Sequence, residues 1–241
     1  MMKSRVTYIL LIITLFSVNT LLCQNEENAS NRFSLGLVFA PQFSNWSYNY
    51  KSEYQDINDL MDSIYKDKNG FSFGFIAEYH FNKSSIKSGL QTSLYPYETV
   101  ILDVNNPANP EFSCGLYSNS GTDYYIDIPF IYKYSFFRTK TLNIFLGAGV
   151  INKFLFYSRT KVFSHCNGVK ELINSSAEVV NDFQYYIAAS IETGIEVSLI
   201  EKLVIGFFPS FEYSLNNKIK EGLIKRKYYQ LGLNLSVGWK I

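Results

Sequence analysis

Apolar and polar residues alternate with a period of two along most of the chain after Arg32, and helical periodicity is almost absent. Successive side chains of a β-strand point to opposite faces, so this pattern predicts strands with one apolar and one polar face. It is clearest at the C-terminus, where small or polar residues separate Leu231, Leu233, Leu235, Val237, Trp239 and Ile241. We predict strands at 33–48, 70–80, 86–97, 124–134, 142–157, 183–197, 203–215 and 228–241.

The segments between these strands are alternately short and long. The short ones span 81–85, 135–141 and 198–202, and the long ones span 49–69, 98–123, 158–182 and 216–227. All long connections therefore leave the sheet at one rim, which is typical of outer-membrane barrels. Several strands also reach the roughly 9–11 residues that a strand needs to cross a bilayer. We predict an all-β fold, an eight-stranded antiparallel up-and-down transmembrane β-barrel.

Alternation alone does not say which face is turned outward, since a soluble lipocalin-like barrel would have its apolar face inside. The predicted apolar face carries no charged residue, as expected where a Lys or Arg at mid-bilayer costs about 2–4 kcal/mol. The lumen of an eight-stranded barrel is only wide enough to be filled by side chains, so small residues are needed there. The polar face supplies them, at Gly36, Gly74, Gly89, Gly147, Gly149, Gly194, Gly206, Gly232 and Gly238. We therefore predict that the polar face lines the lumen.

Charged residues of both signs lie on the polar face. An unpaired charge in a narrow lumen would be costly, so we expect these groups to form a connected network that helps to fill the barrel. A filled lumen argues against a general diffusion pore. The residues are Glu78, Asp127, Glu192, Glu196 and Glu212, with Lys87, Lys133, Lys153 and Lys240.

Three residues fit the strands poorly. Pro129 and Pro209 interrupt two of them, and we expect a bulge or a lost ladder hydrogen bond at each. Asn152 falls on the lipid-facing side, so we expect a bulge or an early strand end near it.

The N-terminal segment has the order of a secretory signal peptide, with Lys3 and Arg5 before the apolar run 6–16. We predict a signal peptide over 1–23 and the barrel domain over 24–241. Lipidation of Cys23 is the alternative, but Leu21 and Leu22 are bulky for a lipidation signal. The net charge of +1 gives no reason to expect a nucleic-acid partner, and 17% aromatic with 18% charged residues suits a surface that partly faces lipid.

The fourth predicted strand, Tyr124-Tyr-Ile-Asp-Ile-Pro-Phe-Ile-Tyr-Lys-Tyr134, resembles that of the PorT-like outer-membrane β-barrel proteins of Bacteroidota, with Asp127 where Glu is usual. Residues 144–149, Ile-Phe-Leu-Gly-Ala-Gly, are similar to the glycine-containing fifth strand of that family. The resemblance implies an eight-stranded outer-membrane barrel. It implies little about activity, although the namesake is associated with gliding and secretion machinery.

Few residues suggest chemistry. Ser72, Glu78 and His80 share one strand face, which could serve a lipid-modifying enzyme, but no flanking motif supports them. We predict no enzymatic activity and no cofactor. Spacing for zinc is absent, and Asp56, Asp59 and Asp62 fit a helix face better than a calcium loop.

The long connections hold two further candidates. Cys114 and Cys166 lie on the same rim, so they either form a disulfide or remain separate thiols. A basic cluster in the fourth connection either contacts lipopolysaccharide phosphates or is an ordinary solvated hairpin tip. Its members are Lys218, Lys220, Lys225, Arg226 and Lys227.

We therefore expect a non-enzymatic outer-membrane barrel with a filled lumen and a structural or interaction role, in which the four long extracellular loops carry out any recognition of a protein partner. Outer-membrane lipid, lipopolysaccharide and the barrel-assembly machinery, through the C-terminal strand, are the expected contacts. An accessory subunit of an envelope secretion or motility machine is the main alternative. A small channel, a lipid-modifying enzyme and a soluble lipocalin-like carrier are the others.

Overall fold

The computed structural model describes residues 32–50, 65–67, 69–100, 102–103, 116–166, 169–216 and 224–241. The described residues form one antiparallel sheet, in which eight strands make a ring. Two further segments, β2 (Tyr65–Asp67) and β5 (Leu102–Asp103), are short additions to its margin. The ring strands are β1 (Phe33–Tyr50), β3 (Asn69–Phe81), β4 (Ser84–Thr99), β6 (Leu116–Arg138), β7 (Leu142–Cys166), β8 (Val169–Ser198), β9 (Leu203–Ser214) and β10 (Ile224–Lys240).

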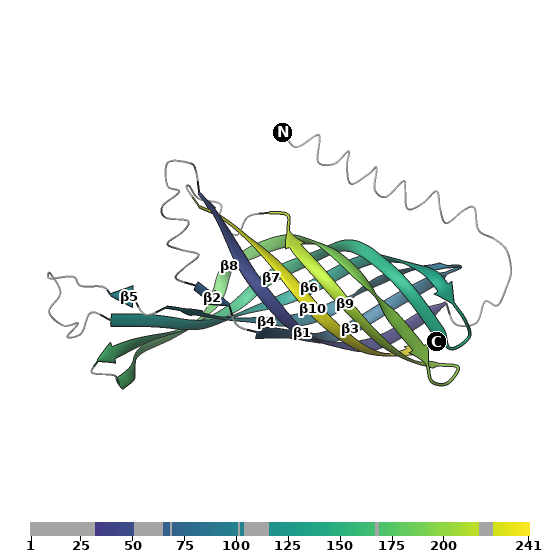
Figure 1. Ribbon diagram of the computed structural model, residues 1–241, viewed down its shortest axis with the longest axis horizontal. Helices are drawn as coiled ribbons and strands as arrows, with labels where there is room; N and C mark the ends of the chain where they lie inside the picture. Colours follow the sequence, from purple (N-terminus) through teal and green to yellow (C-terminus); the bar gives the residue numbers. More distant parts are fainter. Residues whose placement is uncertain are drawn as a thin grey trace. The chain divides into compact units, whose positions relative to one another are not determined.

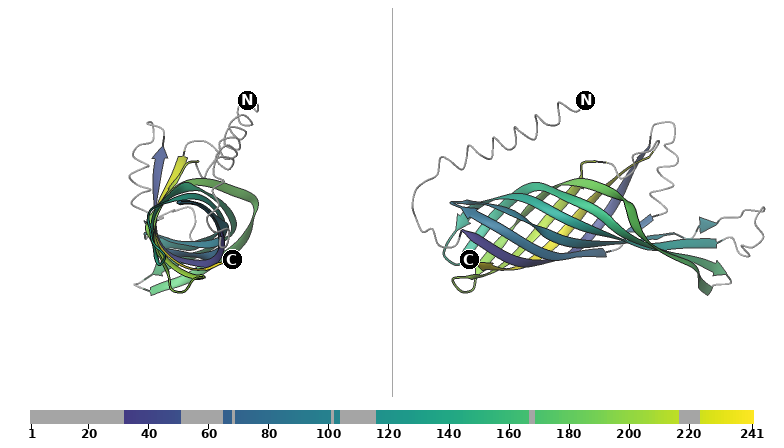
Figure 2. Two further views of the ribbon diagram at one scale, coloured as in Figure 1. Left: turned by 90° about the vertical axis from the view of Figure 1, so that its right-hand side faces the viewer. Right: turned by 180° about the vertical axis from the view of Figure 1, so that it is seen from behind.

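Pairing between the first and last strands closes the ring. Strand β1 pairs with β10 from Ser34–Lys240 to Tyr50–Ile224, and every other ring strand pairs with its neighbours along the chain. Figure 1 shows the tilted strands from the side, and the left view of Figure 2 looks into the ring from one end. The closed ring confirms the predicted eight-stranded antiparallel up-and-down barrel.

The apolar face of each strand is turned outward, as the sequence predicted. Phe75 is 69% exposed and Leu37 is 56% exposed, whereas Val38 and Ala40, on the lumen-facing side of the same strand as Leu37, are buried. Charged side chains such as Lys133 and Asp127 are also buried, inside the ring. This inside-out arrangement suits a barrel that is surrounded by lipid. Within the described residues, the chain has no helix with the length and apolar character that crossing a membrane requires.

Pro129 and Pro209 each interrupt one ladder without producing a bulge. Pairs Ser88–Phe130 and Gln91–Asp127 flank Pro129 in one unbroken register, and no pair is formed at the proline. Pro209 has the same gap, on the side of β8. A proline nitrogen has no hydrogen to donate, so the lost ladder bond that we expected occurs and the alternative of a bulge does not.

Strand β7 does not end near Asn152. The amide is accommodated on the outer face because the Tyr185 hydroxyl donates a hydrogen bond of 2.5 Å to Asn152 Oδ1. A register shift does occur three residues later, between Leu155 and Tyr157. The bulge was therefore expected correctly, whereas the early strand end was wrong.

The third long connection, predicted as a loop over 158–182, is instead a continuation of two strands. Strand β7 runs on to Cys166, β8 begins at Val169, and the two pair from Tyr157–Val179 to Cys166–Val169. Strand β6 also extends, pairing Tyr117 with Ser164. Figure 1 shows these strands continuing past the ring. The prediction failed because the apolar residues of this segment do not alternate regularly with polar ones, although backbone pairing continues through it.

Candidate functional site

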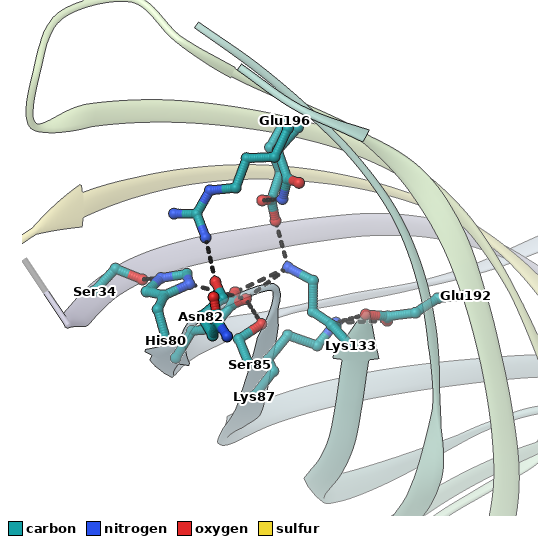
Figure 3. A network of polar contacts seen from close by, with 11 residues as sticks. Ser34, His80, Asn82, Ser85, Lys87, Lys133, Glu192 and Glu196 are labelled. Carbon is teal, nitrogen blue, oxygen red and sulfur yellow. Dashed lines mark hydrogen bonds and ion pairs between the residues drawn. The ribbon is translucent and has the colours of Figure 1, made fainter. Parts of the chain in front are cut away.

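The lumen contains a cluster of charges at the end of the barrel that carries the short turns, which we call the turn rim. Lys133 on β6 lies at its centre, with Nζ 2.8 Å from Glu78 Oε1 and also paired with Glu196. The Ser85 hydroxyl donates to Glu78, and Asn143 Nδ2 donates to Glu196 Oε2 at 2.8 Å. Figure 3 shows the Lys133 ammonium group between its partners from different strands. The two carboxylates thus share one buried cation.

An apolar layer lies next to this cluster. Phe145 on β7 and Phe208 on β9 meet edge to face across the lumen, with ring centroids 5.8 Å apart, and both pack with Val38. Lys133 Nζ lies 4.0 Å from the centroid of Phe145, and Lys87 Nζ lies 4.5 Å from that of Phe208. The rings therefore fill the lumen and also stabilise the two cations through their π faces.

A second charge cluster forms around Lys153 on β7, whose side chain is only 1% exposed. Its Nζ lies 3.0 Å from Asp127 Oδ2, 2.9 Å from Glu212 Oε2 and 2.7 Å from the Tyr95 hydroxyl. The Tyr95 hydroxyl in turn donates to Gln230 Oε1 at 2.5 Å. One lysine, two carboxylates and a phenol from separate strands thus tie the walls of the barrel together.

Four buried tyrosines occupy the lumen beside Lys153. The rings of Tyr95 and Tyr125 meet edge to face with centroids 5.1 Å apart, and Tyr186 and Tyr228 pack in the same group. The space left among them is about 10 Å³, which is close to the smallest space that can hold one water molecule. The four tyrosines and Lys153 therefore fill much of the lumen at this level.

A larger cavity of about 210 Å³ opens at the turn rim. Five cationic residues line it, Lys87, Lys133, Arg138, Lys140 and Lys240, together with His80 and Ser34. The remaining walls are partly apolar, with Ile76, Val204 and Phe208.

His80 contacts a different serine from the one the sequence suggested. Its Nε2 lies 3.1 Å from Ser34 Oγ, whereas Ser72 accepts a hydrogen bond from Gln42. His80 Nδ1 lies 3.7 Å from Glu78 Oε1, beyond hydrogen-bond distance, and Lys133 already pairs with that carboxylate. Ser34 was missed because it comes from another strand, and only ring closure places it beside His80.

The structure brings all five predicted acids together with three of the four lysines. Lys87 pairs with Glu192, Lys133 with Glu78 and Glu196, and Lys153 with Asp127 and Glu212. Lys240 instead donates to Ser198 Oγ at 3.2 Å. Among the described residues, no carboxylate lies within ion-pair distance of it.

The other sequence candidates lie mostly beyond this region. Cys166 is disulfide-bonded, but Cys114 is outside the described residues, so their pairing stays a prediction. Lys225, Arg226 and Lys227 belong to β10, where they pair with residues 47–49 of β1. Several predictions fall wholly outside the described residues: the signal peptide over 1–23, the Cys23 lipidation site, the aspartates Asp56, Asp59 and Asp62, and the basic residues Lys218 and Lys220.

Comparison with known proteins identifies a family. The model of the Outer membrane protein beta-barrel domain matches residues 23–220. No curated protein matches the chain in sequence. Among solved structures, Neisserial surface protein A is 13% identical, with a TM-score of 0.45 over 89% of this chain and 100% of that one.

Two further solved structures show similarity at low identity. The outer membrane protease OmpT from Escherichia coli is 8% identical, with a TM-score of 0.44 over 90% of this chain and 99% of that one. The outer membrane protein OprG from Pseudomonas aeruginosa is 11% identical, with a TM-score of 0.38 over 88% and 97%.

Proposed function

The chain belongs to the outer membrane protein beta-barrel domain family, which places it in the bacterial outer membrane, and we propose that it acts there as a structural and recognition protein. In this proposal the barrel is a sealed membrane anchor. Recognition is carried out by the sheet that β6, β7 and β8 extend beyond the ring. In outer-membrane barrels the rim opposite the short turns faces the cell exterior.

The observation that carries the proposal is the unequal length of β8 and β9. Strand β9 pairs with β8 only over residues 188–198 of β8, whereas β7 accompanies β8 out to Val169. Asn216 ends the β8–β9 ladder, because its Oδ1 accepts from the Ile187 amide at 2.7 Å and its Nδ2 donates to Tyr185 O at 3.0 Å. Beyond that point, the described residues provide β8 with one neighbouring strand only.

An unpaired strand edge is a template for an added strand. Extended peptides bind such edges through main-chain hydrogen bonds, with alternate side chains providing specificity. The tip of the β7–β8 hairpin adds apolar surface, since Val169, Leu172 and Ile173 are each about half exposed. Exposed apolar side chains that adjoin a strand edge support a protein partner rather than a solvated tip.

The filled lumen supports the anchoring part of the proposal over a channel. The Phe145–Phe208 layer and the tyrosine group around Lys153 occupy successive levels of the barrel. An eight-stranded barrel has little room beyond such side chains. Solute passage would require these layers to separate.

Site-specific photo-crosslinking in living cells tests the proposal. A photoreactive amino acid at Leu172 should produce a discrete protein adduct in intact envelopes. The matched control is the same replacement at Leu235, which is equally exposed on the wall of the barrel but faces lipid. Equal adducts at both sites, together with stepwise ion conductance by the purified protein in planar bilayers, would contradict the proposal and favour a small channel.

A second candidate is an accessory subunit of an envelope secretion or motility machine, favoured by the strand motif at Tyr124–Tyr134. In that case the Leu172 adduct would migrate with a large envelope complex on native gels.

The basic cluster of the fourth long connection would contact lipopolysaccharide phosphates beside the partner. Changing Lys225, Arg226 and Lys227 together to Gln should then weaken lipopolysaccharide binding while leaving the Leu172 adduct in place.

A further inference from the structure

We propose that the turn-rim cavity binds a small soluble anion, one that carries a carboxylate or phosphate group, from the periplasmic side. The cavity of about 210 Å³ is smaller than the roughly 300–1,000 Å³ of pockets for drug-sized ligands, so the ligand is of metabolite size. This site lies at the opposite end of the barrel from the extended sheet and is independent of its function.

The charges that line the cavity favour an anion. Its two acids, Glu78 and Glu196, are both held by Lys133. Arg138 and Lys240 have no carboxylate partner among the described residues: Arg138 Nη1 donates to the Asn82 carbonyl at 2.9 Å, and Lys240 Nζ donates to Ser198 Oγ. Two cations beside one partly enclosed space leave positive charge that an oxyanion can neutralise, and arginine offers paired donors for it.

Neutral donors lie on the same wall as Lys240. Ser34 is the register partner of Lys240 on β10 and of Glu78 on β3, so these three residues form one row across neighbouring strands. Directly opposed residues have Cβ atoms roughly 4.5–5.5 Å apart, within reach of one small ligand. The Ser34 hydroxyl and the His80 ring, 3.1 Å apart, add hydrogen-bonding groups at this end of the row. Figure 3 shows His80 and Ser34 adjoining the charged residues of the cavity.

Glycine keeps the cavity open on one side. A Cβ added at Gly238 would meet only Leu35 O, at an ordinary 3.7 Å, so the backbone there tolerates a side chain. At neighbouring Gly36 an added Cβ would lie 2.7 Å from Val237 O, which forbids one. Backbone packing therefore explains why position 36 is glycine. It does not explain Gly238, and in our proposal the open space beside Gly238 holds part of the ligand. The apolar residues Val204 and Phe208 would contact the non-ionic part of the ligand.

The site is a dead-end pocket with its mouth at the turn rim. Thr139 and Lys140 of the β6–β7 turn line the mouth, and short turns of outer-membrane barrels face the periplasm. On the inner side, Phe145 and Phe208 close the lumen. A ligand therefore enters and leaves by one opening.

The test is an NMR titration of the full-length mature protein, isotopically labelled and folded in detergent micelles, with inorganic phosphate and separately with butyrate. We expect saturable shifts of the Ser34 and Lys240 amides. The double variant Arg138→Gln/Lys240→Gln should raise the dissociation constant about tenfold or more, because each lost contact is a charge-assisted hydrogen bond. Gly238→Leu should abolish binding with all charges intact, because its side chain fills the cavity.

Lys202→Gln is the matched control, since it removes a turn-rim lysine that does not line the cavity. It should leave the dissociation constant unchanged. Heat-dependent migration on gels confirms that every variant is folded. The proposal is overturned if Lys202→Gln weakens binding as much as the double variant, or if Gly238→Leu binds like the wild type. It is also overturned if neither soluble anion shifts these amides and only bilayers containing phosphatidylglycerol do so, because the site would then hold a lipid headgroup.

Discussion

Lys87 and Glu192 lie on strands that do not pair with each other, yet Lys87 Nζ is 2.6 Å from Glu192 Oε1 across the lumen. The two residues are 105 positions apart in the sequence, and both side chains are almost completely buried. Lys87 is not joined in this way to Glu78, the residue directly opposite it on β3. Glu78 pairs with Lys133 instead, on a strand that does not pair with β3, whereas Lys153 does pair with its direct register partner Asp127.

Breaking the Lys87–Glu192 pair should destabilise the barrel. Lys87→Met or Glu192→Leu alone leaves an uncompensated buried charge, at a cost of about 3–5 kcal/mol in the free energy of unfolding. The double variant should recover a large part of that loss, because neither charge remains. Urea unfolding of the protein in lipid vesicles measures all three variants. A double variant as unstable as the sum of the single ones would show that the pair is not coupled.

Replacing Gly147 and replacing Gly238 with a larger residue should change the free energy of unfolding by different amounts. A Cβ at Gly147 would lie 2.8 Å from Glu192 Cγ and 3.1 Å from Ile131 Cγ2, so Gly147→Val overpacks the lumen and should cost about 1–3 kcal/mol. Gly238→Val enters open space and should change the free energy of unfolding by less than about 0.5 kcal/mol. Urea midpoints compare the two, and equal losses would contradict the packing argument.

Asn216→Ala should loosen the end of the β8–β9 ladder. The change removes the acceptor of the Ile187 amide and the donor to Tyr185 O, each bond contributing about 1 kcal/mol. Hydrogen exchange at the Ile187 amide should therefore become about fivefold to tenfold faster. The Ile191 amide, further along β8 and within the paired region, is the internal control and should not change.

Cys166 should have Cys114 as its disulfide partner. Cys114→Ser would then leave Cys166 as a free thiol that reacts with maleimide without reductant, whereas the mature wild-type protein should not react. Cys23→Ser is the matched control and should behave as the wild type does. Labelling that appears in Cys23→Ser but not in Cys114→Ser would assign the bond to the other cysteine.

The alternation of apolar and polar residues was enough to identify the outer wall of the barrel. A period of two reports which residues share a strand face, and the run from Leu231 to Ile241 therefore predicted both a strand and its lipid-facing side. Glycines on the opposite face indicated a narrow, filled lumen. The lost ladder bonds at Pro129 and Pro209 also followed from local chemistry, because a proline lacks the amide hydrogen whatever surrounds it.

Tertiary structure alone decided which lumen residues meet. Lys87 forms an ion pair with Glu192, and His80 contacts Ser34 rather than Ser72. Lys240 donates to Ser198, and no carboxylate among the described residues lies within ion-pair distance of it. These contacts depend on how far the strands are staggered when the ring closes. The alternation of apolar and polar residues does not encode that stagger. The sequence pattern also failed to predict the extension of β7 and β8 beyond the ring. Backbone hydrogen bonds hold that hairpin together, and they leave no period-two signal where both faces meet water.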